Sequence, residues 1–349
     1  MSRPHEPETA GERVSMAADG SGRVRVSGPA PRMEEVAARA GQSQRMAAEA
    51  RGASGRTVVA ATAPAATLPA RFDLRDVNGR DFVTAVRDQG DADTGAAFAV
   101  LAALETTAAY TRGVPSLTLD LSEAHLLQGN AHAPVEELFD HVASEGVTFE
   151  DYFPYADRES GAPNPDWPNR MAKAVGVTDL TGDPAAIKQH LFSYGALAAR
   201  LIVHEDFPAH GQGVYRATTD VLGSQCVSLI GWDEDSWIIK NSWGTDWGEG
   251  GFARIAYGEC HIEAYPGGRP SVLGCTSVYL RAWLPAQRAL RLFATANDAN
   301  GWAYLEHLGW THLSGGPHKL DVLTRAQATG RPVTPFVNGD ELSTVRVAE

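Results

Sequence analysis

The chain has 349 residues, enough for one large domain or two smaller ones, and its 43% apolar and 21% charged residues are typical of a soluble globular protein. Its net charge of -13 and the absence of a long Lys/Arg run argue against nucleic acid or an anionic membrane as a partner, since both require a basic surface. No run of apolar residues is long enough to predict a membrane-spanning helix. We therefore expect a protein or peptide partner, and no motif predicts a cofactor or a metal ion.

Residues 1–67 are predicted to form a disordered tail and linker. They are rich in Ala, Gly and Arg, and the first aromatic residue of the chain is Phe72, so the tail lacks the large side chains that offset the entropy of ordering. A weak helix is possible at 33–50. The N-terminus has no apolar segment typical of a secretory signal, and three cysteines (Cys226, Cys260 and Cys275) do not form a disulfide framework, although a Cys260–Cys275 bridge stays open. A cytoplasmic location is the prediction.

Residues 68–284 are predicted to form an α+β domain in which helices come first. Apolar periodicity, with Gly and Pro at the ends, predicts helices at 96–112, 135–144 and 184–193. Asp183 is the expected N-cap of the third helix, because Pro184 follows it. Short apolar runs between Gly and Asp turns predict strands at 197–203, 213–216, 226–232, 236–240, 251–257 and 277–283.

Residues 285–349 are predicted to form a small β/α appendage. Strands are expected at 302–305 and 310–313, and a helix at 320–328 that ends before Gly330. Asn338-Gly339 is a typical turn pair and predicts a hairpin between strands at 333–336 and 342–347.

Two segments identify the domain. The first begins Leu68-Pro-Ala-Arg-Phe-Asp-Leu-Arg75 and continues with Val83-Thr-Ala-Val-Arg-Asp-Gln-Gly90, and the second contains Lys240-Asn-Ser-Trp-Gly244 and Trp247-Gly-Glu249. Together they closely resemble the papain-like cysteine peptidases of family C1, over residues 68–283. This resemblance implies a two-lobe papain-like fold, with a helical left lobe, an antiparallel β-rich right lobe and a groove between them.

The chemistry of that family requires residues that this chain lacks. A thiolate attacks the peptide bond, a histidine holds it and protonates the leaving amine, an Asn orients the histidine, and a Gln helps to bind the oxyanion. On the family pattern, Gly95 occupies the position of the cysteine and Gln225 that of the histidine, while Gln89 and Asn241 are retained. No cysteine precedes Cys226, so no shift of register restores the nucleophile.

A third departure concerns substrate binding. Where the family carries paired glycines that pair with the peptide backbone, this chain has Gly129-Asn-Ala-His-Ala133. We therefore predict a pseudopeptidase, a non-catalytic module that binds a protein or peptide, as scaffold or regulator. The alternatives are a peptidase homologue with residual or altered hydrolytic chemistry and a regulator of an active paralogue.

Several residues near the expected groove are candidates for binding. They are Asp91, Asp93, Thr94, Ala96, His132 and Trp243. Gly95 is either a tolerated small residue at the start of a helix or, with Ala96, the opening of a cavity beside Gln89 that favours anions. Fragments that resemble an aspartic peptidase or a phosphohydrolase lack the hydrophobic strand that those sites require before their first Asp.

The remaining thiols and histidines have two interpretations each. Cys226 follows Gln225 on a predicted strand, so its side chain is expected on the opposite face, in the core. The alternative is that Cys226 is a relocated nucleophile. His204 and His210, with His132, are expected to be solvated loop residues, although each is near enough in the family order to approach the groove.

Overall fold

A computed structural model gives the structure, and it describes residues 16–18, 24–26, 68–128, 132–294, 301–313 and 317–348. The predicted disorder of the tail and the possible helix at 33–50 lie almost entirely outside these residues. Within the tail, only β1 (Met16–Ala18) and β2 (Val24–Val26) are described, as an antiparallel pair.

Five described helices follow. They are α2 (Gly95–Arg112), α3 (Glu123–Leu127), α4 (Val135–Ser144), α5 (Pro184–Ser193) and α6 (Pro317–Thr329). The predicted bounds of α4 and α5 are confirmed. In α5 the carboxylate of Asp183 accepts a hydrogen bond from the Ala186 N–H at 2.9 Å, as the N-cap prediction requires. No described helix is both long enough and apolar enough to cross a bilayer.

The described strands from residue 68 onward join one mixed sheet. They are β3 (Phe72–Asp73), β4 (Val147–Thr148), β5 (Met171–Asp179), β6 (Leu197–His204), β7 (Val214–Tyr215), β8 (Val221–Trp232), β9 (Ser236–Lys240), β10 (Phe252–Ala256), β11 (Val272–Trp283), β12 (Ala289–Ala294), β13 (Gly301–Leu305), β14 (Gly309–Leu313), β15 (Val333–Asn338) and β16 (Glu341–Val347). The main path runs β12-β13-β14-β16-β15-β11-β6-β8-β9-β10-β7. Sequence patterns missed α3, β5 and β12.

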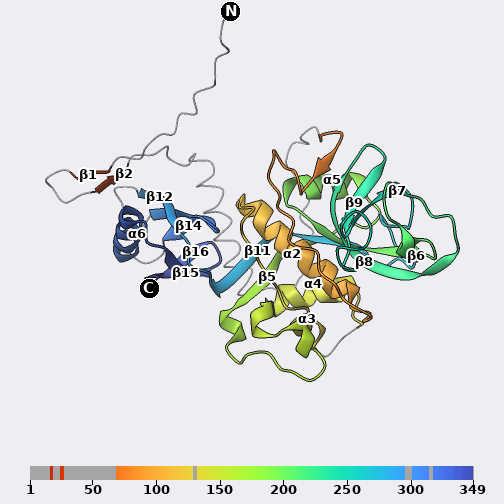
Figure 1. Ribbon diagram of the computed structural model, residues 1–349, viewed down its shortest axis with the longest axis horizontal. Helices are drawn as coiled ribbons and strands as arrows, with labels where there is room; N and C mark the ends of the chain where they lie inside the picture. The colour runs from red at the N-terminus through yellow and green to blue at the C-terminus, as the bar shows by residue number, and fades with distance from the viewer. Residues whose placement is uncertain are drawn as a thin grey trace, which may run out of the picture.

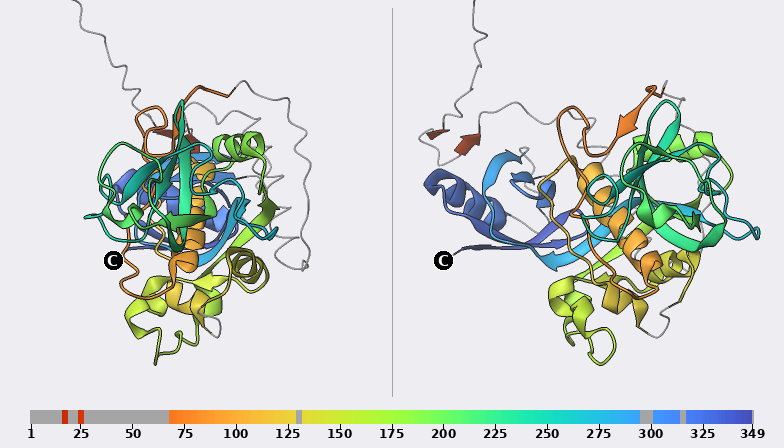
Figure 2. Two further views of the ribbon diagram at one scale, coloured as in Figure 1. Left: turned by 90° about the vertical axis from the view of Figure 1, so that its right-hand side faces the viewer. Right: turned by 45° about the vertical axis from the view of Figure 1, so that its right-hand side comes forward.

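The long helix α2 lies at the centre of the molecule. It packs against β6, β8 and β11 on one side and against α3 and α4 on the other, as Figures 1 and 2 show. Its end is set by Gly113, whose φ of 64° is the left-handed conformation that closes many helices. The expected arrangement, helices on one side and antiparallel strands on the other, is confirmed. This two-lobe fold places the N-terminus of α2 between the lobes.

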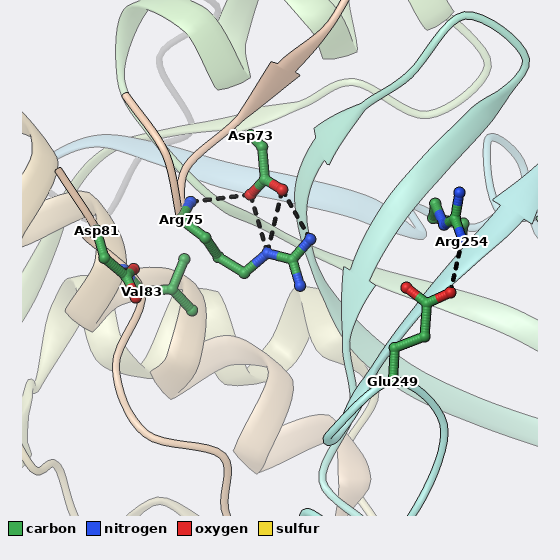
Figure 3. Close-up of polar contacts among 6 residues, drawn as sticks. All are labelled: Asp73, Arg75, Asp81, Val83, Glu249 and Arg254. Carbon is green, nitrogen blue, oxygen red and sulfur yellow. Dashed lines mark hydrogen bonds and ion pairs between the residues drawn. The ribbon is translucent and has the colours of Figure 1, made fainter. Parts of the chain in front are cut away.

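Residues 68–94 form a strap that crosses from the strands to α2. The Leu74 N–H donates to the Ile230 carbonyl, and the Arg75 guanidinium binds the Asp73 carboxylate at 2.7 Å while lying 4.6 Å from the centre of the Phe252 ring. Figure 3 shows this pair beside a second pair, formed at 2.7 Å by Glu249, in the turn before β10, and Arg254 on β10. The strap is thus fixed to the β-rich lobe before it enters α2.

The residues after 285 continue the same sheet. Strand β15 pairs with the end of β11, and α6 packs against β12 and β16. Arg112, the last residue of α2, forms an ion pair with Asp340 at 2.9 Å, with both side chains largely buried. The appendage therefore contacts the end of α2 that is remote from Gly95.

Candidate functional site

The strap brings Gln89 next to the start of α2. The Gln89 N–H donates to the Ser242 carbonyl at 2.9 Å, so the strap is paired with the segment that follows β9. The side-chain amide of Gln89 donates to the Ala92 carbonyl at 2.8 Å, which holds the turn that leads into Gly95. Gln89 is thereby anchored at both its backbone and its side chain.

Two strands of the β-rich lobe supply the facing residues. Gln225 lies in β8, and Asn241 directly follows β9, where its N–H donates to the Gly251 carbonyl. The Gln225 amide nitrogen donates to the Gln89 Oε1 at 2.9 Å and to the Asn241 Oδ1 at 3.1 Å. We call Gln89, Gln225 and Asn241 the amide network. All three side chains are buried.

Backbone groups determine which way each amide of the network points. The Cys226 N–H donates to Gln225 Oε1 at 3.1 Å, and the Ser242 N–H donates to Asn241 Oδ1 at 2.9 Å. A backbone N–H can only donate, so an oxygen must face it in both cases. The Ala92 carbonyl can only accept, so the amide nitrogen of Gln89 must face it. The three orientations are consistent with one another, so the positions of the oxygen and the nitrogen are defined for each of the three side-chain amides.

The amide of Gln225 occupies the space beside Gly95. A Cβ atom added to Gly95 would lie 2.2 Å from Gln225 Oε1 and 2.9 Å from its Cδ. The hypothesis of an open cavity at Gly95 is therefore wrong, because a neutral side chain fills the space and is hydrogen-bonded on three sides. The structure thus brings together all four predicted positions, Gln89, Gly95, Gln225 and Asn241, as one closed group.

The amide network offers no acid, base or nucleophile. Carboxamide side chains are neither protonated nor deprotonated near neutral pH, and glycine has no side chain to react. The hydroxyl of Ser242 donates to Gln89 Oε1 at 2.7 Å, and that of Thr94 pairs with Tyr155 at 2.8 Å. Both hydroxyls are engaged with groups that are not general bases. The arrangement links the two lobes through hydrogen bonds.

Burial raises the pKa of each of the three thiols. All three cysteines are free, so a Cys260–Cys275 bridge is absent. Cys226 is only partly buried, although it packs against the hydrophobic core as predicted. Burial nevertheless raises the pKa of its thiol to about 12, against the opposing effect of Arg200. The thiol is protonated near neutral pH, and thiols attack only as thiolates.

A pocket of about 120 Å³ opens next to the amide network. We call it the groove pocket. One wall consists of Asp93 and Ala96 at the start of α2 together with residues 132–135, and the other of Arg200 on β6 and residues 224–226 on β8. Gln225 belongs to both the pocket and the network. The groove between the lobes is therefore present although its reacting groups are absent.

The other predicted binding residues lie in different places. Asp93 and His132 are mostly exposed and pair at 3.6 Å at the pocket, and Asp91 is exposed nearby. Thr94 is buried, its hydroxyl pairs with that of Tyr155, and it is not among the residues that line the groove pocket. The Trp243 ring packs edge to face against that of Trp247, with the ring centres 5.3 Å apart. It is therefore a packing residue.

Two further histidines stay outside the groove pocket. His204 binds the Thr219 carbonyl at 2.8 Å, and the His210 ring packs 5.2 Å from the Tyr215 ring. His210 is thus a packed residue, contrary to the expectation of a solvated one. In the segment 129–133, which lacks the paired glycines of the family, residues 129–131 lie outside the described part of the chain. The predicted effect of this segment on substrate binding therefore stays untested.

A buried ionic cluster behind the amide network escaped the sequence analysis. It consists of Glu105, Glu123 and Lys240, all less than 9% exposed. The Lys240 ammonium donates to the Thr84 hydroxyl at 3.0 Å, and this hydroxyl donates to Glu105 at 2.7 Å. The signal was available, because Glu105 is a charge on the apolar face of a helix. Glu105 lies in the helix predicted at 96–112, but the sequence analysis did not consider that a buried carboxylate requires a buried partner.

Burial shifts the pKa values of this cluster. Desolvation and the neighbouring Glu105 raise the pKa of Glu123 to about 8, and desolvation lowers that of Lys240 to about 8 despite the attraction of Glu105. A small cavity of about 10 Å³ separates the cluster from Asn241 and Cys226. Among the described residues, no group of three or more His, Cys, Asp and Glu side chains is arranged to hold a metal ion.

We expect the raised pKa of Glu123 to make stability depend on pH. Between about pH 4.5 and pH 8 the folded chain keeps a proton that the unfolded chain has released, so its contribution to the free energy of unfolding falls as pH rises. His125 and His190, whose pKa values burial lowers to about 4, act in the opposite direction below about pH 6.5. Comparison with Glu123→Gln removes their effect, since both proteins share it.

The measurement is urea unfolding of the wild type and Glu123→Gln at pH 5, 6.5 and 8. From pH 5 to pH 8 the wild type should lose on the order of 2 kcal/mol relative to the variant. Glu145→Gln, at an exposed position, is the matched control and should track the wild type at each pH. Parallel curves for the wild type and Glu123→Gln would show that this carboxyl is ionised throughout.

Comparison with known proteins gives a consistent result. The sequence model described as "Papain family cysteine protease" matches residues 68–267, more than half of the chain. A "Cathepsin B-like cysteine proteinase 6" of Caenorhabditis elegans is 44% identical over 114 residues, which are 30% of this chain and 29% of that protein. "Cathepsin B-like CP1" of Giardia intestinalis is 28% identical over 218 residues, 56% of this chain and 71% of that protein. The first of these matches thus spans less than a third of the relative.

Solved structures share the fold at low sequence identity. "proCathepsin B S9 from Trypanosoma congolense" superposes with a TM-score of 0.51 at 22% identity, over 60% of this chain and 78% of that one. The digestive procathepsin L2 proteinase of Tenebrio molitor larval midgut gives 0.52 at 24% identity, over 61% and 69%. These likenesses concern the fold.

Proposed function

This chain belongs to the papain family of cysteine proteases, and from that premise we propose that it is a pseudopeptidase, a non-catalytic module whose groove binds a peptide segment of a partner protein. One observation carries the proposal. The amide of Gln225 fills the space where a side chain at position 95 would stand, and it is hydrogen-bonded to Gln89, Asn241 and the Cys226 N–H. A neutral, closed network replaces the reacting pair.

The groove itself supports the binding part of the proposal. The groove pocket of about 120 Å³ remains between α2 and β8, lined by charged, polar and apolar groups. Pockets of this kind between two lobes bind side chains of a ligand when a few polar groups orient it. The partner is then a protein with an accessible extended segment, and the chain acts as its scaffold or regulator. The three free thiols support the proposed cytoplasmic location.

The experiment measures binding and hydrolysis on the same full-length protein. Binding is followed by fluorescence polarisation with a labelled pool of degenerate hexapeptides, acetylated and amidated, and hydrolysis with labelled casein and a quenched hexapeptide pool. We expect saturable binding and no hydrolysis above that of Gln225→Ala. Ala96→Trp, which fills the groove pocket, should weaken binding about 10-fold, while Ala328→Trp on the exposed side of α6 should not.

The alternative, a peptidase homologue with altered chemistry, is favoured by one feature, the partly exposed Cys226 at the groove pocket. It predicts hydrolysis that Cys226→Ala abolishes. Hydrolysis of this kind would contradict the proposal, and so would a wild-type protein that binds none of the pool.

A further inference from the structure

We propose that Arg200 makes the groove pocket selective for peptides that present a carboxylate, from a Glu or Asp side chain or from a chain end. This inference rests on the proposed function, because it names the chemistry of the peptide that the groove would bind. It adds a determinant of specificity to a site whose reactive residues are absent.

Arg200 is held in place from several directions. Its N–H donates to the Ser271 carbonyl at 2.9 Å, one guanidinium nitrogen donates to the Ser224 hydroxyl at 3.0 Å, and the guanidinium carbon lies 4.1 Å from the centre of the Tyr265 ring. Arg200 also stands directly opposite Cys226 in the β6–β8 ladder. The group is therefore preorganised in the pocket wall, so little side-chain entropy remains to be lost when a ligand binds.

The guanidinium retains binding capacity. It carries five N–H donors in a planar fork that matches a carboxylate. Within the part of the chain that the structure describes, Ser224 accepts one hydrogen bond from it and no carboxylate forms an ion pair with it. A cation that lines a pocket without a countercharge is a binding site for an anion, because an incoming carboxylate replaces water with a charge-assisted hydrogen bond.

The carboxylates around the pocket already have partners of their own. Asp93 faces His132 across 3.6 Å at the exposed rim. Glu136, at the start of α4, binds Arg269 at 2.7 Å, and Glu137 binds the same guanidinium at 3.2 Å. Solvent screens Asp93, whose side chain is 88% exposed, more than it screens the half-buried Arg200. Among the residues that line the groove pocket, Arg200 is the only Lys or Arg.

The test uses four hexapeptide pools that differ only in charge. Three are acetylated and amidated, with Glu, Gln or Lys fixed at the third position, and the fourth has Gln there and a free C-terminal carboxylate. Wild-type protein should bind the Glu pool or the free-acid pool about 10-fold more tightly than the amidated Gln pool. A preference for the Glu pool identifies a side-chain carboxylate as the ligand group, and a preference for the free acid identifies a chain end.

Variants assign the preference to Arg200. Arg200→Gln should lose the preference for carboxylate, so that its affinities for the Glu, free-acid and amidated Gln pools become equal, and Arg200→Lys should keep only part of the preference. Arg216→Gln is the matched control, since Arg216 is exposed and pairs with Asp235 at 3.9 Å outside the pocket. Thermal unfolding confirms that each variant is folded.

The outcomes separate this inference from the proposed function. Equal affinities for all four pools, or a preference for Lys, would overturn the role of Arg200 while leaving peptide binding in place. A carboxylate preference that survives Arg200→Gln would also overturn it. Absence of binding to every pool would overturn the inference and the proposed function together.

Discussion

The double variant Gly95→Cys/Gln225→His is expected to acquire the thiol reactivity of a Cys–His pair. Its thiol at position 95 should be alkylated by iodoacetamide about 30-fold faster at pH 7 than the same thiol in Gly95→Cys alone. The reason is that an adjacent imidazolium lowers a thiol pKa from about 8.5 to below about 5.5, which raises the thiolate fraction at pH 7 from a few per cent to nearly all. Hydrolysis of the quenched peptide pool should appear with it.

The structure explains why both substitutions are needed. Gly95 does not have the positive φ that would exclude other residues, so a cysteine suits its backbone. In the single variant the new Cβ would lie 2.2 Å from Gln225 Oε1, so the glutamine must move and lose its hydrogen bonds. We expect Gly95→Cys to cost about 2 kcal/mol of unfolding free energy and to gain no activation. A histidine at 225 removes this clash and meets Asn241 Oδ1.

Two controls bound the result. Gln225→His alone introduces the imidazole without a thiol at 95 and should not hydrolyse peptides, and the wild type reports the background labelling of Cys226. Equal alkylation rates in the single and double variants would mean that Gln89 and Asn241 no longer hold the geometry in which a Cys–His pair can form. The groove would then differ from its relatives in more than its reacting groups.

The substitution Lys240→Met should be the most destabilising single change in the ionic cluster. It removes the ammonium that donates to Thr84 and leaves the carboxylate of Glu105, which is 5% exposed, without a neighbouring positive charge in the cluster. Removing one partner of a buried charged pair costs about 3–5 kcal/mol, because the other charge stays desolvated. Urea unfolding at pH 7 measures the loss.

A second substitution identifies the cause. Lys240→Met/Glu105→Gln should recover at least half of the loss, since the glutamine can keep the contacts with the Thr84 hydroxyl and the Leu121 N–H without a charge. Lys173→Met, at a more exposed ammonium, should change stability by less than about 0.5 kcal/mol. Strictly additive effects of the two cluster substitutions would rule out a buried charge as the origin.

Local signals predicted those elements whose ends are defined by single residues. Asp183 and Pro184 define the start of α5, and Gly146, with a φ of 92°, closes the turn after α4. Strand β5 was missed because its sequence contains Lys173 and a glycine at 176, and it becomes a strand by pairing with β11. That partner is about a hundred residues away in the chain, so no local pattern reports it.

The candidate site divides in a similar way. The resemblance to the papain family implied that Gln89, Gly95, Gln225 and Asn241 meet, and the structure brings them together. Spacing did not predict that the Gln225 amide would fill the space at Gly95. That conformation depends on simultaneous hydrogen bonds to Gln89 and Asn241, on two other segments of the chain, and to the neighbouring Cys226 N–H, whereas a sequence pattern describes one segment at a time.

Strand β11 has a mechanical consequence for the whole molecule. One end of it pairs with β6, its length with β5, and its other end with β15 of the appendage. Strand β11 therefore joins β6, β5 and β15 rigidly and is not a hinge between them. A force applied to the appendage is transmitted along the backbone of β11 to its other end, which lies beside Arg200 on β6. The appendage and the groove wall therefore respond to that force together.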